Sequence, residues 1–212
     1  MRPFPPRDRD KGERFYSPSN TGVYLSVLLR PVQIAAELAL RLTTMAAAAA
    51  CEAIDAVSGK QTQIKWVNDI YLENRKVAGI LTEGSVSMET GSMDTVILGI
   101  GINVYPPEGG FPGEIRETAG AVLTETAEDG KNRIAAGFLN RFISYYLSGN
   151  FSAYVQTYRK RCFVLGKEIL VRAAASERKA LALDIDEDCR LVVRYEDGSE
   201  DRLNAGEISI KM

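Results

Sequence analysis

Five consecutive alanines, Ala46–Ala50, lie in the middle of a long segment with helical periodicity. Apolar residues such as Leu42 and Ile54 recur at helical spacing between about residues 32 and 57, and Ser58-Gly59 supplies a stop signal. The alanine run is too short to cross a bilayer. Because small side chains let backbones approach each other, we expect one long helix packed tightly against a β-sheet.

Composition limits the chemistry that the chain can perform. It has 212 residues, of which 45% are hydrophobic and 25% charged, as in globular proteins. Its net charge of −2 provides no general attraction to nucleic acid or anionic membranes. The chain has no histidine, which excludes Ser-His-Asp, Cys-His and His-metal mechanisms, and leaves Lys, Arg, carboxylates and amides. Its three cysteines are far apart without CxxC spacing, which argues against zinc and disulfides and favours a reducing cytoplasm.

The order of the predicted elements indicates two domains. An α+β domain is expected over residues 1–162, and a small β-barrel over residues 163–212, with the break at Cys162-Phe163. The hairpin turn Glu196–Gly198 supports the second domain. Strand patterns in the first domain cover residues 24–29, 63–66, 70–72, 76–83 and 94–99, and helical patterns cover 130–147 and 151–161.

Two short patterns carry residues suited to chemistry. Lys65 stands at the end of a predicted strand, where its ammonium can hold a carboxylate or phosphate and stabilise a developing oxyanion. In the segment Gly99–Asn103, alternate glycines permit close backbone approach to a ligand, and the amide of Asn103 can donate and accept hydrogen bonds. Taken singly, each pattern is also typical of an ordinary surface lysine or of a strand that ends in a turn.

Together these patterns resemble a known family. The stretch IKWVNDIYLENRKVAGILTE, residues 64–83, resembles the KWPNDxY…RKxxGIL motif of biotin protein ligases, and GIGINVY, residues 99–105, is similar to their GxGxN motif. Residues 14–31 resemble the family's aromatic-Ser-Pro…Gly-x-Tyr-x-Ser stretch. Residues 165–167 and 206–209 look like the opening and closing of its C-terminal barrel. The resemblance runs from about residue 14 to the end of the chain.

The resemblance implies an α+β fold with a mixed sheet and packed helices, like class II aminoacyl-tRNA synthetases, followed by an SH3-like barrel. It implies that ATP activates biotin as biotinyl-5'-AMP, with Mg²⁺ neutralising the triphosphate. Biotin then passes to a lysine of a biotin carboxyl carrier protein. The expected protein is cytoplasmic and binds neither nucleic acid nor membrane. Its oligomeric state stays open, with a homodimer as one alternative.

The resemblance also assigns roles to individual residues. Lys65 becomes the catalytic lysine, which contacts the biotin carboxylate and the α-phosphate. No residue is expected to bind a metal directly. The other biotin-site residues are Tyr24, Ser26, Gly79 and Ile80, and the nucleotide-site residues are Arg7, Arg9, Phe15, Asn68, Asp69 and Asn103.

The sequence departs from the family at its N-terminal end. It lacks the family's Ser/Thr-Thr-Asn motif, its upstream glutamine and its winged helix, so no repressor function is expected. Residues 7–14 stand where the family has GRGRxGR, and the aspartates there would repel phosphate. Val67 replaces the motif's proline. Because Lys65, Asn68 and Asn103 nevertheless match the family's motifs, we expect a fragment of a ligase rather than a diverged relative.

Other readings stay open. One alternative is a non-catalytic protein that keeps a biotin or nucleotide pocket, and a lipoate-type transferase is disfavoured by the KWxND stretch. Trp66 is expected to pack in the core. Asp69 could serve only the turn, and Tyr24 and Ser26 could be ordinary residues of a strand.

Overall fold

A computed structural model describes residues 16–30, 38–86, 93–149, 151–173, 176–204 and 207–210. Of the predicted site residues, Arg7, Arg9 and Phe15 lie outside the described residues. The first part of the expected long helix, residues 32–37, lies outside them as well.

The first domain is built on a five-stranded sheet in the order β1-β5-β4-β3-β2. Short turns join β2 to β3 and β3 to β4, and two-residue to four-residue turns allow only antiparallel neighbours. All ladders of the described strands are antiparallel, and parallel pairing is limited to the isolated bridges Ile64–Cys162 and Lys76–Ala119. The expected mixed sheet is therefore antiparallel in its described ladders. The strands are β1 (Gly22–Leu29), β2 (Gln63–Lys65), β3 (Asp69–Leu72), β4 (Arg75–Val86) and β5 (Met93–Asn103).

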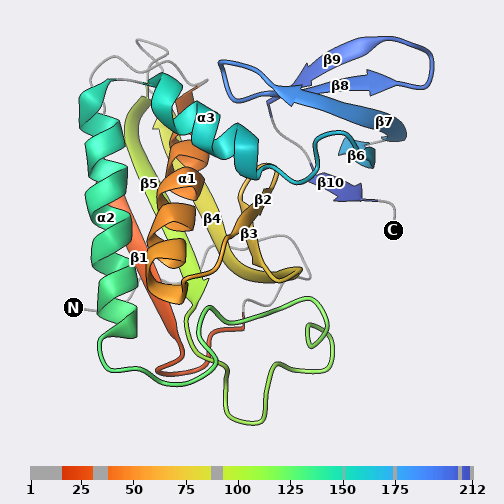
Figure 1. Ribbon diagram of the computed structural model, residues 1–212. Coiled ribbons are helices and arrows are strands. Elements are labelled where there is room, and N and C mark those ends of the chain that lie inside the picture. Colours follow the sequence, from red (N-terminus) through yellow and green to blue (C-terminus); the bar gives the residue numbers. More distant parts are fainter. Residues whose placement is uncertain are drawn as a thin grey trace.

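Three helices cover the sheet: α1 (Leu38–Ser58), α2 (Gly130–Ser148) and α3 (Phe151–Arg161). Figure 1 shows α1 and α2 side by side in front of the same face of the sheet. All of Ala46–Ala50 are 0% exposed, because α1 packs against the sheet, against α2 beside it and against α3. A helix that is apolar on all sides must be buried on all sides. The predicted close packing of α1 is confirmed.

Alternation along β5 separates the two faces of the sheet. Val96, Leu98, Ile100 and Ile102 are at most 3% exposed and belong to the core beneath the helices. Ile97, Gly99, Gly101 and Asn103 alternate with them and therefore point to the other face. We call this second face the open face, because α1 and α2 lie on the first.

The C-terminal part forms a second five-stranded antiparallel sheet in the order β10-β6-β7-β8-β9. The β-structure predicted for this part of the chain is present. No ladder joins β9 to β10 in the part of the chain that is described, and closure into an SH3-like barrel stays a prediction, as does the boundary at Cys162-Phe163. The strands are β6 (Glu168–Ala173), β7 (Ser176–Ile185), β8 (Leu191–Tyr195), β9 (Glu200–Leu203) and β10 (Glu207–Ile210).

A long irregular connection, residues 104–129, joins β5 to α2. Its tip holds Gly109 and Gly110, both with positive φ and with nothing within 4 Å of an added Cβ. Nearer its end the connection is tied to β4, because Lys76 donates its backbone N–H to the Thr118 carbonyl at 2.7 Å. The connection is thus open at its tip and anchored at its base.

The three cysteines lie in the interior of the protein. Cys51, Cys162 and Cys189 are free and buried, and burial raises the pKa of the Cys51 and Cys162 thiols to about 12.

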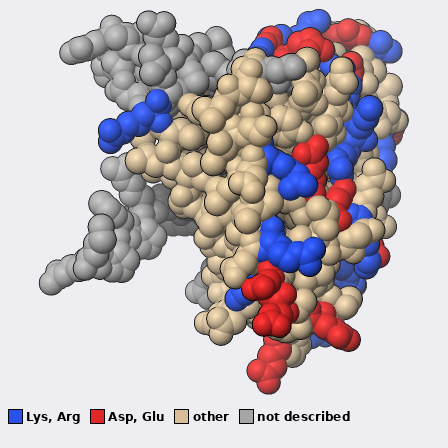
Figure 2. All heavy atoms as spheres, turned by 60° about the vertical axis from the view of Figure 1, so that its left-hand side comes forward, with Lys and Arg blue, Asp and Glu red and all other residues tan. Residues whose placement is uncertain are grey.

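Figure 2 shows basic and acidic side chains interspersed along one side of a largely uncharged face. None of the described helices combines the length and apolar character that crossing a membrane requires.

We expect Ala48→Leu to lower the free energy of unfolding by about 1–3 kcal/mol, because the added methyl groups have no room between α1 and its neighbours. Urea denaturation followed by circular dichroism measures this change. Ala56→Leu, at an exposed position of the same helix, is the matched control and should shift stability by no more than about 0.5 kcal/mol. Equal stability of the two variants would contradict the tight packing of α1.

Candidate active site

Five residues form a row straight across the open face. The strand registers pair Tyr24 with Gly101, Gly101 with Gly79, Gly79 with Asp69 and Asp69 with Lys65. Directly opposed residues on neighbouring strands project from the same face of a sheet. The structure therefore brings together four residues that were predicted separately: Tyr24, Gly79, Asp69 and Lys65.

The middle of this row has no side chains. Gly79 and Gly101 lie next to each other on β4 and β5, so the backbone is accessible between Tyr24 on one side and Asp69 on the other. A Cβ added at Gly79 would find its nearest neighbour, Lys76 Cε, at 3.5 Å, which is ordinary contact distance. Packing does not require this glycine, and its absence of a side chain leaves a shallow floor for a ligand.

Ser26 lies in the adjacent row, where it opposes Gly99. Gly99 in turn opposes Leu81, which is 42% exposed. The hydroxyl of Ser26 is exposed on the same face as Tyr24, which is itself 44% exposed. The predicted pair thus faces away from the core beneath the helices, although neither residue's contact with biotin is tested.

A second lysine, Lys76, reaches the row; it belongs to the RKxxGIL motif but was given no predicted role. Lys76 Nζ lies 2.6 Å from Asp69 Oδ1 and 3.7 Å from the position of a Cβ on Gly79. Regular alternation would place Lys76 on the same face as the buried Ala78 and Ile80. A register shift in the β3–β4 ladder between Ile70 and Tyr71 reverses the alternation and turns Lys76 to the open face.

The row therefore carries two cations and one anion. Asp69 neutralises Lys76, whereas Lys65 makes no ion pair with any described residue. Both Lys76 and Asp69 are partly screened by solvent, with side chains 44% and 20% exposed. The excess of positive charge beside an open glycine floor suits an anionic ligand.

Two hydrogen bonds between Asn68 and Ile80 connect the turn before β3 to β4, beside the row. The side chain of Asn68 donates from Nδ2 to the carbonyl of Ile80 at 2.7 Å, and the N–H of Ile80 donates to the Asn68 carbonyl at 3.0 Å. Ile80 is 3% exposed and points into the helix-covered core, so the structure does not bring its side chain to the open face. Their predicted contacts with nucleotide and biotin stay predictions.

Asn103 lies on the open face, opposite Gly22 at the end of β1. Its Nδ2 donates to the carbonyl of Gly120 at 3.1 Å, and its own carbonyl accepts from the N–H of Val122 at 2.9 Å. A Cβ on Gly120 would come within 2.7 Å of Arg75 Cβ, so only glycine fits there. Asn103 therefore anchors the 104–129 connection beside the row.

Trp66 packs in the core, as predicted, at 3% exposed. Its indole Nε1 donates to the carbonyl of Cys189 at 3.4 Å. The next carbonyl, that of Val67, accepts from the hydroxyl of Tyr158 on α3 at 2.8 Å. The segment between Lys65 and Asp69 is thus fixed from two sides.

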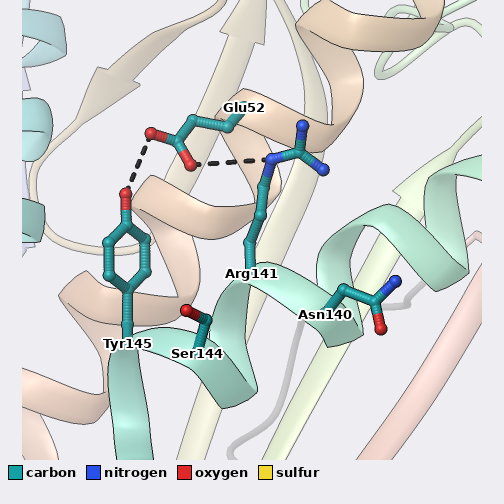
Figure 3. A pocket seen from close by; sticks show the side chains of 5 residues that line it. All are labelled: Glu52, Asn140, Arg141, Ser144 and Tyr145. Carbon is teal, nitrogen blue, oxygen red and sulfur yellow. Dashed lines mark hydrogen bonds and ion pairs between the residues drawn. The ribbon is translucent and has the colours of Figure 1, made fainter. Parts of the chain in front are cut away.

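A hollow between α1 and α2 belongs to the helical layer and not to the row (Figure 3). Within it, Glu52 accepts a hydrogen bond from the Tyr145 hydroxyl at 2.9 Å and lies 3.6 Å from Arg141 Nε. The charges of Glu52 and Arg141 thus offset each other. Asn140 and Ser144 complete the lining of the hollow.

The described side chains in and around the row do not form a metal-binding site. The described residues include no group of three or more His, Cys, Asp or Glu side chains placed to hold a metal ion. The carboxylate that does lie in the row, Asp69, is already paired with Lys76. The described side chains therefore do not fit a protein-bound Mg²⁺.

Known structures share this architecture. A biotin protein ligase from Aquifex aeolicus superposes with a TM-score of 0.74 at 23% identity, covering 90% of this chain and 82% of that one. The same enzyme in complex with biotin and ATP gives a TM-score of 0.70 at 22% identity, covering 90% and 78%. The fold is that of the biotin protein ligases.

Sequence comparisons agree with the fold. Residues 9–103 match the biotin/lipoate A/B protein ligase family, and residues 164–211 match the biotin protein ligase C-terminal domain. A biotin–[acetyl-CoA-carboxylase] ligase from Paracoccus denitrificans is 31% identical over 180 residues, 80% of this chain and 72% of the relative. The chain belongs to the biotin protein ligase family.

Other relatives are longer. The bifunctional ligase/repressor BirA of Bacillus subtilis is 31% identical over 190 residues, which is 87% of this chain but 57% of that protein. The corresponding protein of Bacillus spizizenii is 30% identical over 189 residues and is likewise covered over 57% of its length. The chain thus spans a little over half the length of these relatives.

We expect Asn68→Ala to lower the free energy of unfolding by about 1–3 kcal/mol, because the buried carbonyl of Ile80 loses its side-chain donor. Thermal and urea unfolding measure the loss. Asn140→Ala removes an exposed amide from α2 and serves as the matched control, with little change expected. A variant at Asn68 as stable as this control would show that the hydrogen bond does not hold the turn.

Proposed function

We propose that the chain catalyses ATP-dependent activation of biotin and its transfer to a lysine of a biotin carboxyl carrier protein. The observation that carries this proposal is the row on the open face, in which Lys65 and Lys76 both lie on the Asp69 side of a floor of glycines, with Tyr24 on the other side. Family membership supports the choice of substrates, since the Aquifex aeolicus relative is described in complex with biotin and ATP.

In the first half-reaction, a carboxylate oxygen of biotin attacks the α-phosphorus of ATP. A new P–O bond forms, the bond to the β-phosphate oxygen breaks, and pyrophosphate leaves with the electron pair. Two anions must approach each other, so cations between them lower the barrier. Lys65 carries this role as predicted from the sequence, and the placement of Lys76 next to Gly79 supports a share in it.

In the second half-reaction, the amine of an acceptor lysine attacks the acyl carbon of biotinyl-5'-AMP. An amide bond forms, the acyl C–O bond to AMP breaks, and the amine loses a proton. The shallow open floor supports access for a protein-bound lysine, because Tyr24 is exposed, the other residues of the row are partly exposed, and α1 and α2 lie on the opposite face of the sheet.

Tyr24, Ser26 and Gly79 would contact biotin, and Asn103 and Asp69 the nucleotide, with Arg7, Arg9 and Phe15 completing the nucleotide site. Tyr24 and Ser26 lie on β1 opposite Gly101 and Gly99, beside the glycine floor, which supports their place next to biotin. Mg²⁺ would enter bound to the phosphates of ATP and neutralise their charge. No protein ligand for the ion is proposed.

A non-catalytic biotin or nucleotide binder is the second candidate. It is favoured by Asp8 and Asp10, which stand where phosphate-binding arginines would be expected. Incubating the chain with biotin, ATP, Mg²⁺ and an acceptor domain separates the two, since a binder takes up ligand without forming pyrophosphate or biotinylated acceptor.

We expect Lys65→Ala and Lys76→Ala each to reduce biotinyl-5'-AMP formation by at least about 100-fold, the usual effect of losing a charge that stabilises a transition state. Pyrophosphate release measures the rate. Lys160→Ala, at an exposed site on α3, is the control and should keep the rate of the unmodified chain. An unchanged rate in both variants of the row would place the reaction elsewhere.

We expect Gly79→Ala to fold normally but to raise KM for biotin about tenfold or more, since a single methyl group in a ligand floor costs about 1–3 kcal/mol. Steady-state kinetics with varied biotin give KM. Gly113→Ala, where an added Cβ meets nothing within 4 Å, is the matched control. The same KM in the two variants would mean that biotin does not lie over Gly79.

A further inference from the structure

The loop between β7 and β8, residues 186–190, joins the C-terminal sheet to the helices of the first domain. Asp188 accepts a hydrogen bond from Arg41 of α1, with 2.5 Å between the charged atoms. Just before the loop, the carbonyl of Ile185 accepts from Arg159 Nε of α3 at 2.8 Å. Figure 1 shows α3 running from the helical layer towards this sheet.

The centre of this loop is buried. Cys189 is 0% exposed and has a left-handed φ of 65°, which is uncommon for a residue other than glycine. Its Sγ lies 3.7 Å from the hydroxyl of Tyr154 on α3. The same residue offers its carbonyl to the indole of Trp66. The loop thus brings one backbone acceptor to the segment that follows Lys65.

Trp66 is held by the loop, and its neighbour Val67 by α3. The indole donates to Cys189, and the Val67 carbonyl accepts from Tyr158, which is fully buried. Lys65 precedes these two residues and Asp69 follows them after Asn68. A shift of the segment would change the distance of both charged groups from the glycine floor.

We propose that the 186–190 loop of the C-terminal domain is a positioning element for the active site: through Trp66 it sets the place of Lys65 relative to Asp69. The proposal rests on the proposed function for its catalytic consequence. Its structural content, that the loop holds Trp66, can be measured without turnover. Trp66 and Asp188 are positioning residues and need not touch substrate.

Trp66 is the only tryptophan of the chain, so its fluorescence reports this contact directly. Asp188→Ala removes the ion pair with Arg41 and a second ion pair with Arg190 within the loop. We expect a red-shifted emission and stronger acrylamide quenching in this variant, because water reaches the indole. Asp188→Glu keeps the charge and should restore most of the shielding. The matched control is Arg194→Ala, which breaks an ion pair with Glu200 between β8 and β9; the replaced side chain is 51% exposed, close to the 52% of Asp188.

The same variants are then assayed for biotinyl-5'-AMP formation. We expect kcat/KM to fall about tenfold in Asp188→Ala, because small displacements of catalytic groups have large effects on rate. Asp188→Glu should recover it, and Arg194→Ala should match the unmodified chain. Circular dichroism before each assay identifies any variant that fails to fold, in which case Arg41→Gln, which removes the same ion pair from the α1 side, replaces Asp188→Ala.

The outcomes are distinct. If Trp66 stays shielded in Asp188→Ala, or becomes exposed while kcat/KM stays unchanged, the positioning proposal is overturned. If the unmodified chain forms no biotinyl-5'-AMP, the proposed function fails instead. The fluorescence comparison with Arg194→Ala then still decides whether the loop holds Trp66.

Discussion

The burial of residues 42–51 of α1 on every side is the constraint on which the rest of the structure depends. Five alanines let this helix pack closely against the sheet, against α2 beside it and against α3. The driving force is the removal of apolar surface from water, concentrated on one face of the sheet. The other face carries the glycines and lysines suited to chemistry, together with exposed apolar side chains such as Leu81 and Ile97.

One irregularity in the sheet decides which charges meet on that face. Without the register shift beside Tyr71, Lys76 would point among the apolar residues beneath the helices, where an ammonium group is costly. With the shift, it lies beside Asp69 at the solvent boundary. The carboxylate offsets one of two nearby cations, which lessens their mutual repulsion before an anionic ligand arrives.

Much of this arrangement could be predicted from local patterns. Helical spacing located α1, α2 and α3, and apolar alternation located the strands, because each pattern reflects a period set by backbone geometry. Motif resemblance named Tyr24 and Ser26, and their spacing of two residues on β1 puts them on one face. Motif resemblance singled out Lys65 and Asp69, whose common row follows from the sheet register.

Other features depend on contacts between distant segments and could not be predicted in this way. The side-chain direction of Lys76 follows from a bulge, for which the local sequence has no glycine or proline signal. The partner of Trp66 is Cys189, 123 positions away, and no periodicity encodes that meeting. Ile80 was assigned to the biotin site through a motif, whereas its side chain lies in the core.

The 104–129 connection combines a fixed base with an unattached tip. Its base is hydrogen-bonded to Lys76 and Asn103, while Gly109 and Gly110 have open surroundings. Foreign sequence is accommodated best where backbone groups are exposed and few contacts are lost. An epitope or a dye-labelling peptide inserted between these two glycines should therefore leave the strands undisturbed. Such an insertion would allow the protein to be imaged or immobilised with both termini unaltered.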